Sequence, residues 1–84
     1  MKLIFADEAW EDSLYWQTQD RRMVERIDKL IEETWRDSFA GIGKPEPLKH
    51  ALAGFWSRRI TDEHRMVYRM EGGALLIAQL RFHY

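Results

Sequence analysis

A short interruption divides this 84-residue chain into two halves with different periodicities. Residues 39–47 read FAGIGKPEP, and their two glycines and two prolines are incompatible with regular structure. Apolar residues recur at helical spacing before the interruption and alternate as in β-strands after it. Two helices followed by hairpins predict an α+β fold, with both helices on one face of a mostly antiparallel, four- to five-stranded sheet. A chain this short has room for one core, so we expect residues 1–84 to form a single domain.

The first half predicts one short strand and a first helix. Lys2–Phe5 is an apolar run typical of a strand. Asp7 is the expected N-cap of a helix that runs to Gln19, with further acids in its first turn. The residues of this helix expected in the core are Trp10, Leu14 and either Tyr15 or Trp16.

A second helix is the clearest prediction in the sequence. Asp20 is its expected N-cap, and apolar residues follow at i, i+4, i+7, i+8 and i+11. That spacing places these residues in one continuous stripe, expected to face the core, along one side of the helix. Its members are Met23, Ile27, Leu30, Ile31 and Thr34.

The second half predicts strands at Phe55–Ile60, His64–Met70 and Ala74–Tyr84, with a candidate short strand at His50–Leu52. Turns are expected at 61–63 and 71–73. Alternation in the last strand directs one set onto the helices: Ala74, Leu76, Ala78, Leu80 and Phe82. The opposite face of the sheet is then expected to collect Arg59, Arg65, Arg69, Gln79, Arg81 and His83. This set predicts a basic patch that contains a titratable histidine.

The net charge of −1 conceals an asymmetry. Residues 1–37 carry a net charge of −4, and residues 38–84 carry +3. Such an imbalance between halves favours a polyanion-binding face on the second half. The alternative is that the helices are acidic and the strands carry arginine only for solubility.

Several classes of site are excluded or disfavoured. The absence of cysteine excludes disulfides, cysteine-based zinc sites and thiol nucleophiles. The histidines at 50, 64 and 83 lack the close spacing of metal ligands, and GIGK lacks the spacing of a phosphate-binding loop, so we expect no metal and no cofactor. No apolar run could span a membrane, and the early acids differ from a secretory signal, so we expect a cytoplasmic protein without membrane association.

Two positions could supply acid–base chemistry. Glu46 lies between two prolines that stiffen its backbone, with Lys44 and Lys49 close in sequence. His83 follows an apolar strand whose aromatic residues could anchor the end of the chain. Metal-free RNA cleavage needs a base, a cation for the phosphorane-like charge and an acid. Glu46, Arg65 (with Arg59) and His83 would fill these roles, although a solvated glutamate and a frayed terminus are the alternatives.

Four stretches together resemble the YoeB toxins of the RelE-like superfamily of bacterial toxin–antitoxin modules. They are KPEPLKH (44–50), GFWSRRIT (54–61), EHRMVY (63–68) and RFHY (81–84), and residues 10 and 14–16 also fit. The order, the separations and the overall length match the family over the whole chain. Phe82 departs from the family, since a tyrosine is common there.

The resemblance implies a ribosome-dependent, metal-independent mRNA endonuclease that cuts in the A site of the 70S ribosome by 2′-OH attack. It implies Glu46 as general base, Arg65 as transition-state arginine and His83 as general acid. Lys49, Arg59 and Tyr84 match supporting phosphate- or base-contacting positions, and we predict Lys44 and Arg81 as further substrate-binding residues. The resemblance also implies a homodimer, neutralisation by a YefM (Phd-like) antitoxin, and operator DNA binding only through the antitoxin complex, which represses the operon.

Two other classes of function use the same residues. A non-catalytic RNA- or ribosome-binding module would need the arginines but no acid or base. A pure interaction module would dock a partner through exposed aromatic residues.

Overall fold

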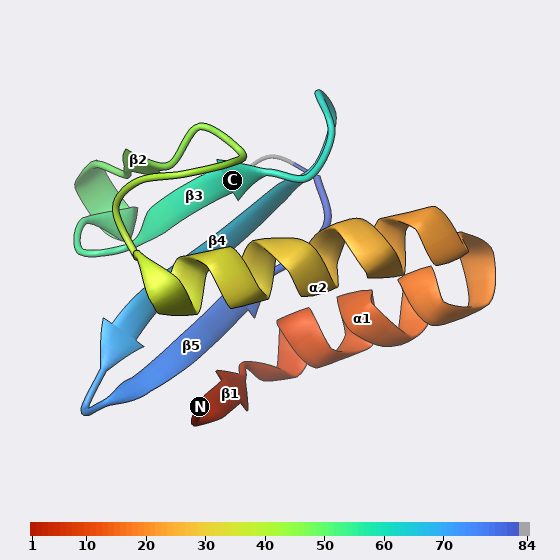
Figure 1. Cartoon of the computed structure of the whole chain (residues 1–84), viewed down its shortest axis with the longest axis horizontal. Helices are drawn as coiled ribbons and strands as arrows, with labels where there is room; N and C mark the ends of the chain where they lie inside the picture. The colour runs from red at the N-terminus through yellow and green to blue at the C-terminus, as the bar shows by residue number, and fades with distance from the viewer. Residues whose placement is uncertain (83–84) are drawn as a thin grey trace.

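The computed structural model of the chain describes residues 1–82, which form a mixed sheet with two helices on one face (Figure 1). In chain order the elements are β1 (Leu3–Phe5), α1 (Asp7–Gln19), α2 (Arg21–Arg36), β2 (Glu46–Pro47), the 3-10 helix η1 (His50–Leu52), β3 (Trp56–Arg59), β4 (Arg65–Glu71) and β5 (Ala74–Gln79). The strand order is β1-β5-β4-β3-β2. Only the β1–β5 pair is parallel among these strands, so the predicted fold is confirmed.

Helix α2 forms as its sequence predicts. The Asp20 carboxylate accepts a hydrogen bond from the Arg22 backbone N–H at 3.0 Å, which is the expected N-cap. All five members of the predicted stripe are buried. The polar member, Thr34, donates its hydroxyl to the Leu30 carbonyl at 2.6 Å, so its burial leaves no unpaired hydroxyl.

Helix α1 differs from the prediction at its cap and on its buried face. It begins at Asp7 without a side-chain cap, so Asp7 is the first helical residue, where its charge favours the helix dipole. Trp10 and Leu14 are 50% and 44% exposed, and the expectation that they lie in the core is wrong. Of the two alternatives Tyr15 and Trp16, Trp16 is the one in the core, as predicted, and the unpredicted Ala9 is buried two turns before it. The small Ala9 permits close approach to the sheet.

The side chains of β5 that pack against the helices are not the predicted set. Leu75 and Ile77 belong to the core, whereas Leu76 lies on the opposite face, across from Arg69. The pairing register gives the reason: Val67 pairs with Gln79, but Tyr68 pairs with Ile77, so β5 contains a bulge at position 78.

The bulge reverses the alternation after position 77. Leu80 therefore returns to the core, as predicted, and Gln79 shares the opposite face with Val67. Phe82 is half exposed, and the strand ends at Gln79, so the predicted strand is too long.

Two short segments also differ from the sequence prediction. Glu46–Pro47 lies inside the predicted interruption but pairs with Trp56–Ser57 as the edge strand β2. Proline is tolerated there because an edge strand need not donate every N–H. His50–Leu52 forms the 3-10 helix η1 and not a strand.

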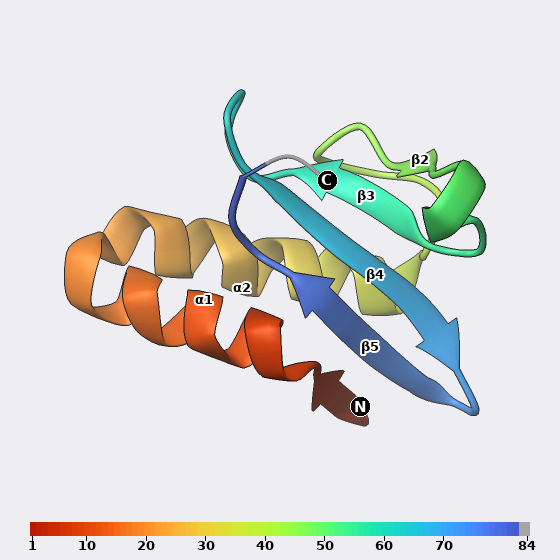
Figure 2. The same ribbon diagram turned by 180° about the vertical axis from the view of Figure 1, so that it is seen from behind.

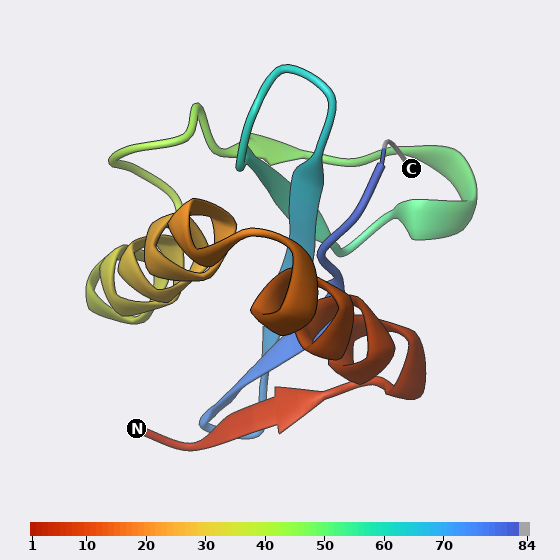
Figure 3. The same cartoon turned by 90° about the vertical axis from the view of Figure 1, so that its right-hand side faces the viewer.

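The two faces of the sheet have different surroundings. Both α-helices cover one face, and the opposite face is turned toward the viewer in Figure 2. The segment with η1 lies on the side away from α2 (Figure 3). Among the described residues, neither helix is long and apolar enough to cross a membrane.

Candidate functional site

The pairing register brings three predicted site residues onto the face of the sheet that the α-helices leave uncovered. Glu46 pairs with Ser57 across β2 and β3, and Arg59 pairs with Arg65 across β3 and β4. Residues paired in this way project to the same face, and Ser57 and Arg59 share a face because they are two residues apart. Glu46 and Arg59 are exposed. A carboxylate and two guanidinium groups therefore share one side of three adjacent strands.

Arg65 is held in place by the turn that precedes it. Its Nη1 donates to the carbonyl oxygens of Thr61 at 2.6 Å and Asp62 at 2.8 Å. Only 7% of the residue is exposed. Two backbone carbonyls therefore hold the Arg65 guanidinium in a defined orientation. Such a preorganised cation can stabilise developing negative charge at little reorganisation cost.

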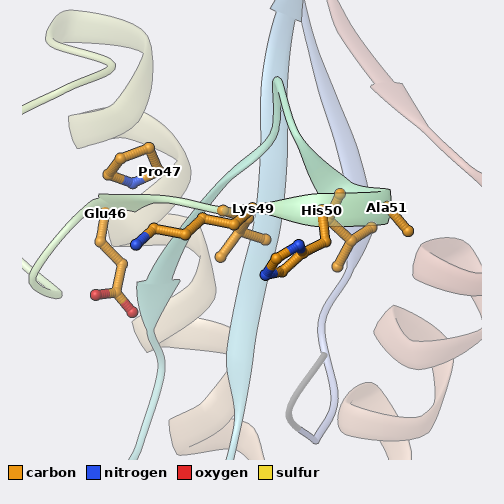
Figure 4. Close-up of a pocket in the computed structure, with 7 residues that line it drawn as sticks. Glu46, Pro47, Lys49, His50 and Ala51 are labelled. Carbon is orange, nitrogen blue, oxygen red and sulfur yellow. The ribbon is translucent and has the colours of Figure 1, made fainter.

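The segment that carries Glu46 surrounds a hollow on the surface. A hollow of about 430 Å³ is lined by residues 46–52. In Figure 4 the Glu46 carboxylate, the Lys49 amino group and the His50 ring extend to the same side of this segment. Glu46, Lys49 and His50 are all exposed. His50 was not predicted as a site residue, although it ends the KPEPLKH stretch and directly follows Lys49.

Gly43 anchors the beginning of this segment. Its carbonyl accepts the Arg59 backbone N–H at 2.6 Å, and its φ of +82° is one that other residues rarely adopt. A Cβ there would lie 2.9 Å from Leu30 Cδ2 and 3.1 Å from the Arg59 carbonyl oxygen, so a side chain at this position would be crowded. The next residue, Lys44, is exposed and also has positive φ, at +49°. The loop therefore has a defined path into β2.

Arg58 is a buried residue that the sequence reading missed. It is fully buried on the helix-covered face, next to the exposed Arg59. Its guanidinium donates to the carbonyls of Asp37, Ala40 and Ile42 and to the Tyr68 hydroxyl. The signal was available in the sequence, because alternation from Trp56 places Arg58 on the same face as that tryptophan.

Tyr68 completes this buried network. Its hydroxyl donates to the Ser38 carbonyl at 2.7 Å while accepting from Arg58 Nε. Burial raises the pKa of Tyr68 above its ordinary value of 10.0, and the hydrogen bond and charge of Arg58 offset part of that rise. The network ties the 37–42 loop to the sheet.

Two other arginines of the predicted patch are held by contacts with neighbouring side chains. Arg69 lies on the predicted face but pairs with Glu71 at 3.0 Å and stacks 4.8 Å from the Phe55 ring centroid. Arg81 stacks 3.6 Å from the ring centroid of Tyr15 on α1. The prediction that Arg81 joins the open face of the sheet is wrong, because the aromatic surface of α1 holds its guanidinium.

The remaining site residues of the sequence prediction, His83 and Tyr84, lie outside the described residues. Within residues 1–82, no group of three or more histidine, aspartate or glutamate side chains could hold a metal ion. The chemistry that the described groups offer is anion binding by arginine and lysine, with one carboxylate among them that can accept a proton.

Comparison with known proteins gives matches over the whole chain. A family model described as "YoeB-like toxin of bacterial type II toxin-antitoxin system" matches residues 5–84. Toxin YoeB of Escherichia coli K12 is 60% identical over 84 residues, which are 100% of both chains. The structure of a YoeB/ParE toxin from Agrobacterium tumefaciens has a TM-score of 0.95 and 55% identity, with 100% of both chains covered.

Two further structures are of the Staphylococcus aureus protein. One is a heterotetrameric YoeB–YefM toxin–antitoxin complex, with a TM-score of 0.92 and 41% identity. The other is a YoeB dimer, with a TM-score of 0.93 and 41% identity. Each match covers 100% of this chain and 98% of the compared chain.

These matches agree with the fold and with the residues on its uncovered face. They define a class of protein, the toxins of bacterial type II toxin–antitoxin systems. Within that class, the chain belongs to the YoeB family.

Proposed function

We propose that this toxin is a ribosome-dependent endoribonuclease that cleaves mRNA in the A site without a metal ion. In this reaction the ribose 2′-OH loses its proton and attacks the adjacent phosphorus, and the bond to the 5′-oxygen of the next nucleotide breaks. The products are a cyclic phosphate and a 5′-hydroxyl. The observation that carries the proposal is the register that places Glu46, Arg59 and Arg65 on one uncovered face.

Each role follows from the chemistry of the side chain. Glu46 accepts the 2′-OH proton, since a carboxylate is the one proton acceptor among these three groups. Arg65, fixed by the 61–62 carbonyls, stabilises the charge on the phosphorane-like transition state, and the exposed Arg59 binds the phosphate. Lys49 and Lys44 flank Glu46 and add phosphate contacts.

His83 is the proposed general acid, which protonates the departing 5′-oxygen, and Tyr84 is a proposed base or phosphate contact. Both roles rest on the family match, which extends to residue 84. Arg81 is proposed to support this end of the chain from its stacked position on Tyr15.

The test is cleavage of a translated mRNA on purified ribosomes, mapped by primer extension. We expect cuts within A-site codons for the wild-type protein and a loss of at least about 100-fold in Glu46→Gln and His83→Ala. A matched control is Glu33→Gln, which removes a carboxylate that pairs with Arg36 on α2. Retained cleavage in Glu46→Gln and His83→Ala would contradict the roles.

A non-catalytic RNA-binding module would give a different outcome in the same assay. Arg59→Ala and Arg65→Ala would weaken ribosome binding, but no cleaved product would form with the wild-type protein. If the wild-type protein neither cleaves nor binds, the exposed aromatic residues would point to a pure interaction module.

We also propose partners by similarity. The toxin of Staphylococcus aureus forms a complex with YefM and a dimer, and we infer that this chain binds a YefM-like antitoxin and forms a homodimer in the cytoplasm. The toxin binds operator DNA only as part of its complex with the antitoxin, and this complex represses the operon. Co-expression with the neighbouring antitoxin gene should abolish growth arrest, and co-purification should recover both chains.

A further inference from the structure

His64 lies at the junction of three parts of the molecule and has no role in the reaction proposed above. It follows the turn at 61–63 and directly precedes Arg65 at the start of β4. Its backbone N–H donates to the Thr61 hydroxyl at 3.2 Å, and only 12% of its side chain is exposed. A nearly buried imidazole beside a proposed active-site arginine calls for a physical reason.

The ring is held between helix α1 and the segment that follows β5. Its centroid lies 4.8 Å from that of Trp16 and 5.3 Å from that of Phe82. Trp16 is itself fixed, since its Nε1 donates to the Leu80 carbonyl at 2.9 Å. The imidazole therefore has a defined orientation relative to Trp16 and Phe82.

The orientation directs one ring nitrogen at the backbone. His64 Nδ1 accepts a hydrogen bond from the Phe82 N–H at 2.7 Å. A backbone N–H can only donate, so Nδ1 carries no proton in this arrangement and the proton of the neutral ring is on Nε2. Nε2 faces the Glu63 carboxylate at 3.6 Å, which favours that tautomer.

The carbonyl of the same residue is also held. Phe82 O accepts the Arg65 backbone N–H at 3.1 Å and the Gln79 side-chain amide at 3.3 Å. The consecutive residues His64 and Arg65 thus bind both backbone polar groups of Phe82. Phe82 has a φ of +58°, which residues with a side chain rarely adopt. Strained backbone of this kind persists where surrounding contacts over-determine it.

We propose that His64 is a positioning residue that fixes the backbone of Phe82, the residue that precedes the proposed general acid in the sequence. The inference rests on the proposed function, because it gives His64 its effect through the proposed general acid. The imidazole acts by accepting the Phe82 N–H, and the ring stacking keeps Nδ1 in place for that bond. An acid displaced by about 1 Å loses a large part of its contribution, so loss of this bond lowers the rate of cleavage.

Two substitutions separate the hydrogen bond from the packing. His64→Asn retains an acceptor at the position of Nδ1 but removes the ring. His64→Phe retains an aromatic ring but removes the acceptor. In single-turnover cleavage on ribosomes, we expect His64→Phe to lower the rate at saturation by at least about tenfold, with ribosome affinity unchanged. We expect His64→Asn to recover most of that loss.

A measurement without activity keeps the proposal testable if a variant is poorly folded. The measurement is NMR on the Glu46→Gln protein, which keeps the wild-type His64. The nitrogen chemical shifts of the imidazole should identify an unprotonated Nδ1, and the Phe82 amide hydrogen should exchange slowly with solvent. Rapid exchange of that amide, or a protonated Nδ1, would overturn the proposal.

The outcomes distinguish this proposal from the one on which it rests. No cleavage by wild-type protein contradicts the proposed function and leaves the amide measurement as the test of the hydrogen bond. Cleavage that Glu46→Gln abolishes supports the proposed function. In that case equal rates for wild type and a folded His64→Phe, or equal losses in His64→Phe and His64→Asn, would overturn the role of His64.

Discussion

The two faces of the sheet use neighbouring arginines in opposite ways. On the helix-covered face, Arg58 is fully buried and its guanidinium is bonded to three carbonyls and the Tyr68 hydroxyl. On the other face, Arg59 is exposed. The two residues are adjacent, so the pleat of β3 alone separates them. The number of arginines in a strand therefore does not predict an anion-binding surface by itself. Each arginine must first be assigned to the covered or the uncovered face of the sheet.

The largest expected effect is on the covered face. Arg58→Met should lower the free energy of unfolding by about 3–5 kcal/mol, because it leaves several buried oxygens without their donor. Urea unfolding followed by tryptophan fluorescence measures this change. A loss below about 1 kcal/mol would mean that the buried network adds little to the free energy of unfolding and serves mainly to select one conformation of the 37–42 loop.

A smaller loss is expected where the loop from this network packs on α2. Gly43→Ala should cost about 2–3 kcal/mol, from positive φ together with the close approach to Leu30. Gly54→Ala is the matched control, since its φ is +95° but no atom lies within 4 Å of an added Cβ. The control should cost only about 1 kcal/mol. Equal losses would show that the packing against Leu30 is easily relieved.

Tyr68→Phe should cost about 1–2 kcal/mol at neutral pH, because Ser38 O and Arg58 Nε each lose a partner. The raised pKa of Tyr68 means that the folded state favours the neutral phenol. This contribution is present below pH 10 and is lost as the pH rises through the higher folded pKa. Wild-type stability should therefore fall above pH 10, and Tyr68→Phe should fall less steeply in the same urea titrations.

The smallest effect on stability is expected on the uncovered face. Arg59→Met should change the free energy of unfolding by less than about 0.5 kcal/mol. It should instead weaken binding to single-stranded RNA and reduce the slope of log affinity against log salt by about 0.7. Fluorescence anisotropy over a range of salt concentrations measures both. An unchanged slope would exclude a phosphate contact at Arg59.

The sequence predicted most of the fold because its elements are local. The stripe of α2, the Asp20 cap and the positions of three strands follow from periodicity and capping chemistry. The errors occurred where a tertiary contact decides the outcome. Trp10 and Leu14 are as apolar as Trp16, and only the approach of Ala9 to the sheet shows which face of α1 is buried.

The candidate site was predictable in its residue types and not in its grouping. Glu46 and Arg65 were identified from prolines, charges and family resemblance, but the β2–β3 pairing that relates them lies within a segment expected to be irregular. Arg81 was assigned to the wrong surface, because its stacking on Tyr15 depends on how α1 packs.

The sequence by itself determined the two helices, the alternating strands and the family, because each follows from the local spacing and identity of residues. The tertiary structure alone decided which arginine is structural, where β5 reverses its faces, and how His64 reaches Phe82. The physical reason is that strand register, a bulge and helix rotation are set by contacts between distant segments. Such contacts decide which face a side chain lies on, and the identity of the residue does not reveal that face.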